Sequence, residues 1–246
     1  MGSRARLTSF DLAPGDLVAG KYVVQDLLGR GYEGEVYLVK ERVTGVERSA
    51  KLFFPHRNER DRAVRHHARK LHRLRNCPVL IQYHTREIHR FGDVAVSVMV
   101  SEYVDGELLP AFLKRQPGGR LDVFQAMRLV RVLALGVEDI HALGEHHGDL
   151  HVGNVLVARR GLEFSVKLVD PFPPDSSRSA AEARLDDVWE MIRLLHHIAG
   201  GARRYASQPP EFKDVCCGLK RSLIARKFRT AGELRWYLEN LEWTSR

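Results

Sequence analysis

Two stretches of the chain carry residues whose types and spacing suit chemistry on phosphate groups. The first is the octet 147–154, which reads HGDLHVGN and places Asp149 five residues before Asn154. It is polar, follows a long amphipathic segment and precedes the apolar run 155–157, so we predict a loop between two ordered elements. Aspartate, histidine and glycine are also ordinary turn residues that hydrogen-bond their own backbone. The octet alone therefore fits a turn as well as it fits a loop for phosphoryl transfer.

The second stretch is residues 29–36, GRGYEGEV, which match the pattern G-x-G-x-x-G-x-V. Its glycines let backbone amides approach phosphates closely, where side chains would obstruct them. A dinucleotide-binding turn is the alternative, but that turn needs a helix after the glycines. Here residues 36–39 are β-branched or aromatic and a turn signal follows at Thr44 and Gly45. This order predicts strand, loop and strand, and favours a loop that covers the phosphates of a nucleotide.

In chain order these stretches, the Ala-Lys pair at Lys51 and an aspartate at the end of the apolar run 164–169 resemble the protein kinase-like superfamily. The resemblance covers nearly the whole chain. It implies that Asp149 orients the attacking hydroxyl and accepts its proton. It also implies that Asn154 and Asp170 hold the Mg²⁺ ion that bridges the phosphates of ATP. The catalytic set is then Asp149, Lys51 and Asn154.

The same resemblance implies which residues bind ATP. Lys51 would contact the α- and β-phosphates, and residues 101–108 are similar to the hinge of the family. Ser101 would guard the pocket behind adenine, and its small side chain predicts that bulky adenine analogues are accepted. The other residues assigned to ATP are Gly29, Gly31, Gly34 and Val36 in the loop, and Glu102 and Val104 in the hinge, whose backbones would bond adenine.

Several positions depart from the family pattern. The helix after Lys51 reads HHARK at residues 66–70, with no glutamate to orient the lysine. This predicts either that Asp170 or the nucleotide holds Lys51, or that the protein is a poor catalyst. Pro171 and Phe172 stand where Phe-Gly is usual, and Gly148 stands where many kinases carry arginine. His151 stands where protein kinases usually carry lysine, so the sequence HGDLH resembles that of aminoglycoside phosphotransferases more closely. The segment from Asp170 to the next helix, which is predicted to begin near Asp186, is short and has three prolines at its start: Pro171, Pro173 and Pro174.

Composition and charge limit the class of protein. The chain has 246 residues, 44% of them hydrophobic, and a net charge of +8, much of which lies in a predicted helix within residues 57–75. A solvated basic face is favoured there over an acidic partner, and nucleic acid is disfavoured because no aromatic residues are interleaved for stacking. No apolar run is long enough to span a membrane. We therefore expect a cytoplasmic location with no membrane contact, and three cysteines in the reduced state.

The pattern and the resemblance together predict an α+β, two-lobed protein kinase-like fold. Residues 1–20 form an arm, residues 21–104 a five-stranded antiparallel N-lobe with one helix, and residues 105–246 a mostly helical C-lobe. ATP would lie between the lobes. Asp122 is expected to cap a long helix, and Thr230 to Glu233 form a capping box for the last one. Asp187 resembles the buried aspartate that ties down the catalytic loop, with an exposed first-turn aspartate as the alternative.

Three functions remain open. The first is an ATP-dependent kinase that transfers the γ-phosphate to a serine or threonine hydroxyl of a protein, including the chain itself. The second is a small-molecule kinase, favoured by the histidine-rich loop and the short segment after Asp170. The third is a pseudokinase that binds nucleotide or a partner without turnover, supported by the absent helix glutamate. Retention of Lys51, Asp149, Asn154 and Asp170 argues against the third, because binding alone needs no such set.

Overall fold

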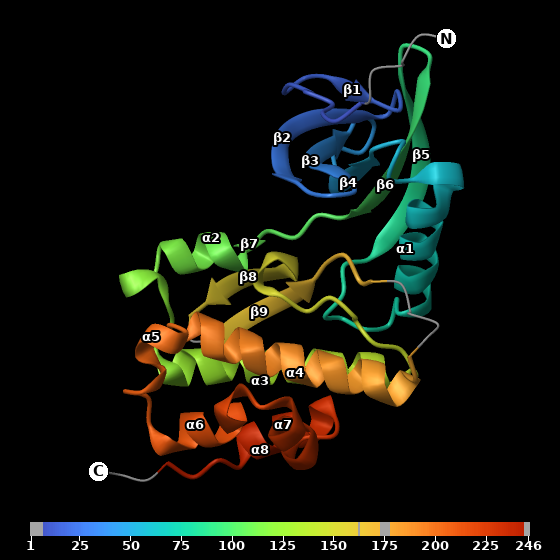
Figure 1. The fold of residues 1–246 in the computed structure, drawn as a ribbon. Coiled ribbons are helices and arrows are strands. Elements are labelled where there is room, and N and C mark those ends of the chain that lie inside the picture. The colour runs from blue at the N-terminus through green and yellow to red at the C-terminus, as the bar shows by residue number, and fades with distance from the viewer. Residues whose placement is uncertain (1–6, 162, 173–177, 244–246) are drawn as a thin grey trace. The chain divides into compact units, whose positions relative to one another are not determined.

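The structure is a computed structural model and describes residues 7–161, 163–172 and 178–243. The chain falls into two compact units, whose elements are labelled in Figure 1. The first unit holds the chain up to Arg75 together with Ile81–Val104. The second holds Asn76–Leu80 and the chain from Asp105 on. Each unit buries its own set of apolar side chains.

An antiparallel sheet dominates the first unit. Its strands lie in the order β1-β2-β3-β4-β6-β5, and every neighbouring pair is antiparallel. Five of them have seven to nine residues and form the predicted five-stranded lobe. All but β4 carry several β-branched or aromatic residues, which suit a pleated surface. The sixth, β1, has two residues and comes from the predicted arm. The bounds are β1 (Leu17–Val18), β2 (Tyr22–Arg30), β3 (Gly34–Glu41), β4 (Glu47–Phe53), β5 (Tyr83–Phe91) and β6 (Val94–Glu102).

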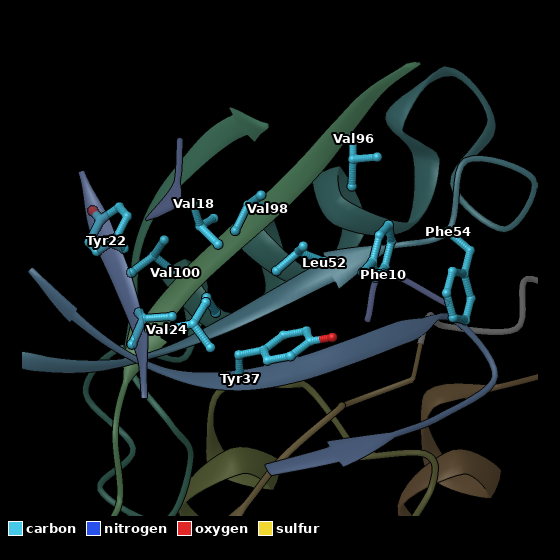
Figure 2. Packing of buried hydrophobic residues seen from close by; sticks show 12 residues of the cluster. Phe10, Val18, Tyr22, Val24, Tyr37, Leu52, Phe54, Val96, Val98 and Val100 are labelled. Carbon is cyan, nitrogen blue, oxygen red and sulfur yellow. The ribbon is translucent and has the colours of Figure 1, made fainter. Parts of the chain in front are cut away.

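The core of the first unit lies on one face of this sheet, as Figure 2 shows. Alternate residues of the strands point into it, among them Val24, Tyr37 and Leu52. Phe10 joins them from the segment before β1, and its ring stacks on Phe54 with centroids 5.2 Å apart. The described part of the predicted N-terminal arm is therefore packed into the first unit.

One helix, α1 (Arg62–Arg73), accompanies the sheet and follows a single 3-10 turn, Glu59–Asp61. Its apolar residues Val64 and Leu71 are buried. The predicted basic outer face is present, although Lys70 is an exception because it is only 3% exposed. The helix ends before the predicted stop at Pro78. Its exposed basic residues are Arg62, Arg65, Arg69, His72 and Arg73.

The second unit is mostly helical, as predicted. A three-stranded sheet with the order β7-β8-β9 carries the candidate catalytic loop at one end. Long helices α3 and α4 pack against each other, and α8 packs on both. The bounds are β7 (Glu107–Leu108), α2 (Leu109–Lys114), α3 (Val123–Ala142), β8 (Val155–Arg160), β9 (Glu163–Leu168), α4 (Ala180–Ile198), α5 (Ala202–Tyr205), α6 (Pro210–Cys216), α7 (Arg221–Lys227) and α8 (Ala231–Glu239).

Side-chain caps set where the helices of this unit begin. Asp122 Oδ1 accepts a hydrogen bond from Gln125 N at 2.9 Å, which confirms the predicted cap of α3. Thr230 Oγ1 accepts one from Glu233 N at 3.1 Å. A capping box also needs the Glu233 carboxylate to accept from Thr230 N. Here that carboxylate accepts from Arg229 N instead, so this half of the prediction is wrong. The cap of α8 is therefore only half of a capping box.

Helix α4 begins earlier than predicted. The sequence suggested a start near Asp186, whereas α4 begins at Ala180 behind a complete capping box between Ser179 and Glu182. Both bonds of the box are present, at 3.2 Å from Glu182 N to Ser179 Oγ and at 2.9 Å from Ser179 N to the Glu182 carboxylate. Asp187 consequently lies inside the helix and not in its first turn. The predicted short segment after Asp170 is described only up to Phe172 and from residue 178 on.

No helix within the described ranges combines the length and the apolar character needed to cross a membrane.

Candidate nucleotide and phosphoryl-transfer site

The octet 147–154 is the last part of the connection between α3, which ends at Ala142, and β8, which begins at Val155 (Figure 1). Within it, Asn154 Nδ2 donates to the backbone oxygen of Asp149 at 2.9 Å and to Asp149 Oδ2 at 3.0 Å. Asn154 is 8% exposed, whereas the Asp149 side chain is 43% exposed. The spacing of five residues therefore lets a buried amide hold a carboxylate that faces outward.

Asp187, in the middle of α4, fixes the start of this loop. Its Oδ2 accepts a hydrogen bond from His147 N at 2.7 Å and its Oδ1 accepts one from Gly148 N at 2.8 Å. His141 Nε2 lies 3.0 Å from Oδ2 and must carry the proton there, since a carboxylate only accepts. Burial by itself raises the pKa of Asp187, but the His141 hydrogen bond, the charge of His147 and the Gly148 N–H outweigh it and lower the pKa. Of the two readings of Asp187, the structure shows the loop anchor.

The segment around Asp170 is bonded to the same loop. Val169 N donates to the backbone oxygen of Asn154 at 3.0 Å, and Phe172 N donates to that of His147 at 2.8 Å. Asp170 itself has a positive φ of 51°, an uncommon conformation for a residue other than glycine. The structure thus brings the two residues predicted to hold Mg²⁺, Asn154 and Asp170, to neighbouring places.

The donor chemistry of this pair fits Mg²⁺. The ion prefers oxygen ligands and usually takes only one or two carboxylates from the protein, the rest coming from water and substrate phosphates. Because Asn154 Nδ2 is bonded to Asp149, the amide presents its oxygen away from that carboxylate. Asn154 Oδ1 and the Asp170 carboxylate are the atoms that would hold the ion, whose charge would offset that of the phosphates.

Two further polar side chains surround Asp149. His151 Nε2 lies 3.5 Å from Asp149 Oδ2, and both side chains are about half exposed. Glu190, on α4, is partly buried and bonded to Arg193 at 3.2 Å. Burial raises the pKa of Glu190; Arg193 opposes this, and the charge of Asp149 adds to the rise. Glu190 was not predicted, although it lies inside the predicted helix, three residues after Asp187.

In the first unit, the turn between β2 and β3 carries the glycines. Gly31 N donates to Gly34 O at 2.9 Å and closes the turn. A Cβ at Gly34 would lie 1.9 Å from Leu52 O on β4, so this glycine is required for close packing of the strands. A Cβ at Gly29 would meet no atom within 4 Å, and one at Gly31 would meet only Gly34 O at 4.0 Å, so both leave open space over the turn. Val36 pairs with Lys51 across β3 and β4.

Lys51 has a carboxylate partner in its own unit. Its Nζ lies 2.8 Å from Glu33 Oε2, and His67 Nε2 lies 2.9 Å from the same oxygen. Burial by itself raises the pKa of Glu33, but the His67 hydrogen bond and the Lys51 charge outweigh it and lower the pKa to about 2. The premise that Lys51 lacks a carboxylate partner is therefore wrong, whereas a contact of Lys51 with Asp170 or the nucleotide stays a prediction. Sequence patterns missed Glu33 because it occupies a variable position of the glycine motif.

The predicted hinge starts at the end of β6. Ser101 is 1% exposed, and its hydroxyl makes no hydrogen bond within the part of the chain that the structure describes. Glu102 N donates to Gln82 O at 2.9 Å, and its backbone oxygen accepts from Ser49 Oγ at 3.0 Å. A buried hydroxyl without a hydrogen-bond partner fits a polar ligand beside it. Val104, two residues after Glu102, follows the strand.

Comparisons with known proteins agree with this geometry. The family model described as protein kinase domain matches residues 22–172, more than half of the chain. A putative cyclin-dependent kinase F-2 of Oryza sativa subsp. japonica is 33% identical over 144 residues, which are 57% of this chain and 44% of that protein. The serine/threonine-protein kinase PknE of Mycobacterium bovis is 31% identical over 185 residues, 73% of this chain and 30% of PknE. The chain thus spans less than half the length of these relatives.

Among solved structures, a double mutant of the PknI kinase domain of Mycobacterium tuberculosis superposes with a TM-score of 0.69 at 22% identity. The match covers 93% of this chain and 98% of that one. This similarity confirms the predicted two-lobed fold. Together with the family match, it also confirms the resemblance on which the motifs were assigned: the chain belongs to the protein kinase domain family.

Proposed function

We propose that the chain is an ATP-dependent serine/threonine protein kinase, which transfers the γ-phosphate of ATP to a hydroxyl group of a protein. The observation that carries the proposal is the Asp149–Asn154 pair on a loop fixed from below by Asp187. A half-exposed carboxylate held by a buried amide is suited to orient a hydroxyl and accept its proton. The names of the relatives, several of which are serine/threonine-protein kinases, support the choice of acceptor.

The remaining predicted residues would bind and position ATP. Lys51 would contact the α- and β-phosphates under the turn of Gly29 and Gly31, and the backbones of Glu102 and Val104 would bond adenine. Asn154 and Asp170 would hold Mg²⁺. In this type of reaction the protein does little covalent work, and positioning together with charge neutralisation supplies most of the rate.

Incubation of the purified chain with γ-labelled ATP and Mg²⁺ tests the proposal. We expect label to appear on the chain or on an added protein substrate, and Asp149→Asn to lower the rate by about 100- to 10,000-fold, the usual contribution of a general base. Asp93→Asn is the matched control, because Asp93 is exposed in the turn between β5 and β6 and loses the same charge. Equal rates for the wild type and Asp149→Asn would contradict the proposal.

A small-molecule acceptor is the second candidate. It is favoured by His151 beside Asp149 and by Glu190, a second carboxyl near enough for the Asp149 charge to raise its pKa, which would suit a cationic acceptor. ADP release that depends on an added metabolite, with no label on protein, would support this candidate over the first.

The pseudokinase alternative loses its main support. It rested on the absent helix glutamate, and Glu33 now gives Lys51 a carboxylate partner. An acidic protein at the exposed basic face of α1 and a cytoplasmic location stay predictions of the sequence.

A further inference from the structure

Three elements of the first unit meet at the carboxylate of Glu33. Glu33 lies in the turn between β2 and β3, Lys51 in β4 and His67 in α1. Glu33 Oε2 accepts from Lys51 Nζ at 2.8 Å and from His67 Nε2 at 2.9 Å. The side chains of Lys51 and His67 are only 9% and 5% exposed, and that of Glu33 is 31% exposed. One oxygen therefore connects the turn, the strand and the helix.

The backbone holds Glu33 against β4, so the contact does not depend on the side chain alone. Phe54 N donates to Glu33 O at 2.8 Å, just beyond the end of β4. On the other side of the turn, Gly34 packs so closely on Leu52 that no other residue would fit. A short tether of this kind lowers the entropy lost when the carboxylate is held beside the lysine.

Helix α1 has no carboxylate of its own at the place where Glu33 contacts Lys51. Its residue at this place is His67, whose Nε2 must donate because its partner oxygen only accepts. The ring of His67 also lies near that of Phe53, with centroids 6.0 Å apart, and Lys51 Nζ lies 5.2 Å from the Phe53 ring. The helix therefore contacts the lysine indirectly, through the turn.

We propose that Glu33 is the positioning residue for Lys51, and that it takes over from within the phosphate-covering turn the role that related kinases give to a helix glutamate. This inference rests on the proposed function, since it assigns Lys51 to the phosphates of ATP. It has a consequence for nucleotide binding. The turn that covers the phosphates and the lysine that contacts them move together, and a rotation of α1 is not required to set the lysine.

Kinetics of phosphoryl transfer test the role. Glu33→Gln keeps the shape and removes the charge, and we expect it to lower kcat/KM for ATP by about 10- to 100-fold, as loss of positioning typically does. Lys51→Met should lower kcat/KM by at least as much. The double variant should have the same kcat/KM as Lys51→Met alone, because the two residues act as one unit. Glu47→Gln is the matched control, since Glu47 is exposed on the same strand as Lys51.

Rescue separates positioning from a general role in stability. Position 67 faces the same oxygen, so a carboxylate placed there can reach the lysine from the helix. We expect Glu33→Gln combined with His67→Glu to recover most of the lost kcat/KM. A Glu33→Gln variant that stays within twofold of the wild type, while Lys51→Met is inactive, would overturn the inference and leave the proposed function standing. So would a failure of the combined variant to exceed Glu33→Gln when both are folded.

A readout that needs no turnover keeps the two proposals apart. Acetylation of Lys51 by acetic anhydride, followed by mass spectrometry and referenced to exposed Lys40, reports how well the amine is held. Glu33→Gln should raise the relative rate at Lys51 several-fold. If neither the wild type nor any variant transfers phosphate, the proposed function fails. The acetylation rate still decides the inference, because an unchanged rate in Glu33→Gln would contradict it.

Discussion

Two carboxylates, one in each unit, perform similar tasks in different surroundings. Asp187 and Glu33 each accept a hydrogen bond from the Nε2 of a histidine whose side chain is at most 8% exposed, His141 at 3.0 Å and His67 at 2.9 Å. Each also holds a part of the candidate site. Asp187, however, bonds two backbone N–H groups from inside a long helix and is 1% exposed, whereas Glu33 bonds a lysine side chain from a turn and is about a third exposed.

The difference follows from what each carboxylate holds. The loop around Asp149 needs one fixed shape, and bonds to its backbone from a buried group supply it. A lysine that contacts phosphates needs a partner that can move away when a nucleotide binds. Separating an ion pair costs less free energy when its carboxylate is partly exposed than when it is buried. We therefore expect losses at Asp187 to appear mainly in stability, and losses at Glu33 mainly in activity.

The largest effect is expected for Asp187→Ala. Removing the carboxylate leaves the buried N–H of His147 without this acceptor and also breaks the bond to Gly148 N, so the free energy of unfolding should fall by about 3–5 kcal/mol. Urea denaturation measures it. Asp105→Asn is the control in the same unit, since Asp105 is exposed. A loss below about 1 kcal/mol would mean that the catalytic loop keeps its shape without the anchor.

The next effect concerns the histidine beside that anchor. His141→Phe keeps the ring and removes the donor, so Asp187 keeps two hydrogen bonds of three in a buried place. We expect the free energy of unfolding to fall by about 1–3 kcal/mol, the usual cost of an unsatisfied buried group. Urea denaturation beside Asp187→Ala measures it. Because the two residues share a contact, the double variant should lose less than the sum of the single losses.

The features of the fold and the site that could be predicted from the sequence are those set by neighbouring residues. The strands of the first unit and the loop of Asp149 follow from local alternation and spacing, and both were predicted. The start of α4 was placed near Asp186, although the capping box at Ser179 and Glu182 was visible in the sequence. Glu190 lay inside the predicted helix all the same, but no spacing rule related it to Asp149.

The contact between Glu33 and Lys51 could not be predicted, for a different reason. The family pattern directs attention to an acid on the helix, and no local rule says that a variable residue of the glycine motif turns toward β4. His67 gave the one available signal, as a polar residue on the buried face of a helix at the turn where the acid is missing. Such a residue needs a hydrogen-bond partner, but the sequence does not say which one.

A pH titration measures how much the ionised form of Glu33 contributes to stability. The folded pKa of Glu33 is about 2, below its ordinary value of 4.5, so its contribution to stability is complete above pH 4.5 and is lost as the pH falls toward 2. At neutral pH we expect Glu33→Gln to lower the free energy of unfolding by about 1 kcal/mol, since the group is partly exposed. Below pH 3 the difference between Glu33→Gln and the wild type should shrink, which urea denaturation at several pH values checks. A difference that grows on acidification would mean that the protonated form of Glu33 is the one the fold stabilises.

The smallest effect is expected for His67→Phe, the counterpart of His141→Phe. Glu33 then keeps Lys51 as a donor and can bond water through its exposed side, so the free energy of unfolding should change by only a few tenths of a kcal/mol. The Phe ring can also retain the packing on Phe53. Urea denaturation of the two histidine variants side by side gives the measurement, with the His141 variant expected to lose more. Equal losses would show that the partly exposed carboxylate depends on its histidine as much as the buried one does. The difference proposed between Asp187 and Glu33 would then depend on the contact of Glu33 with Lys51 alone.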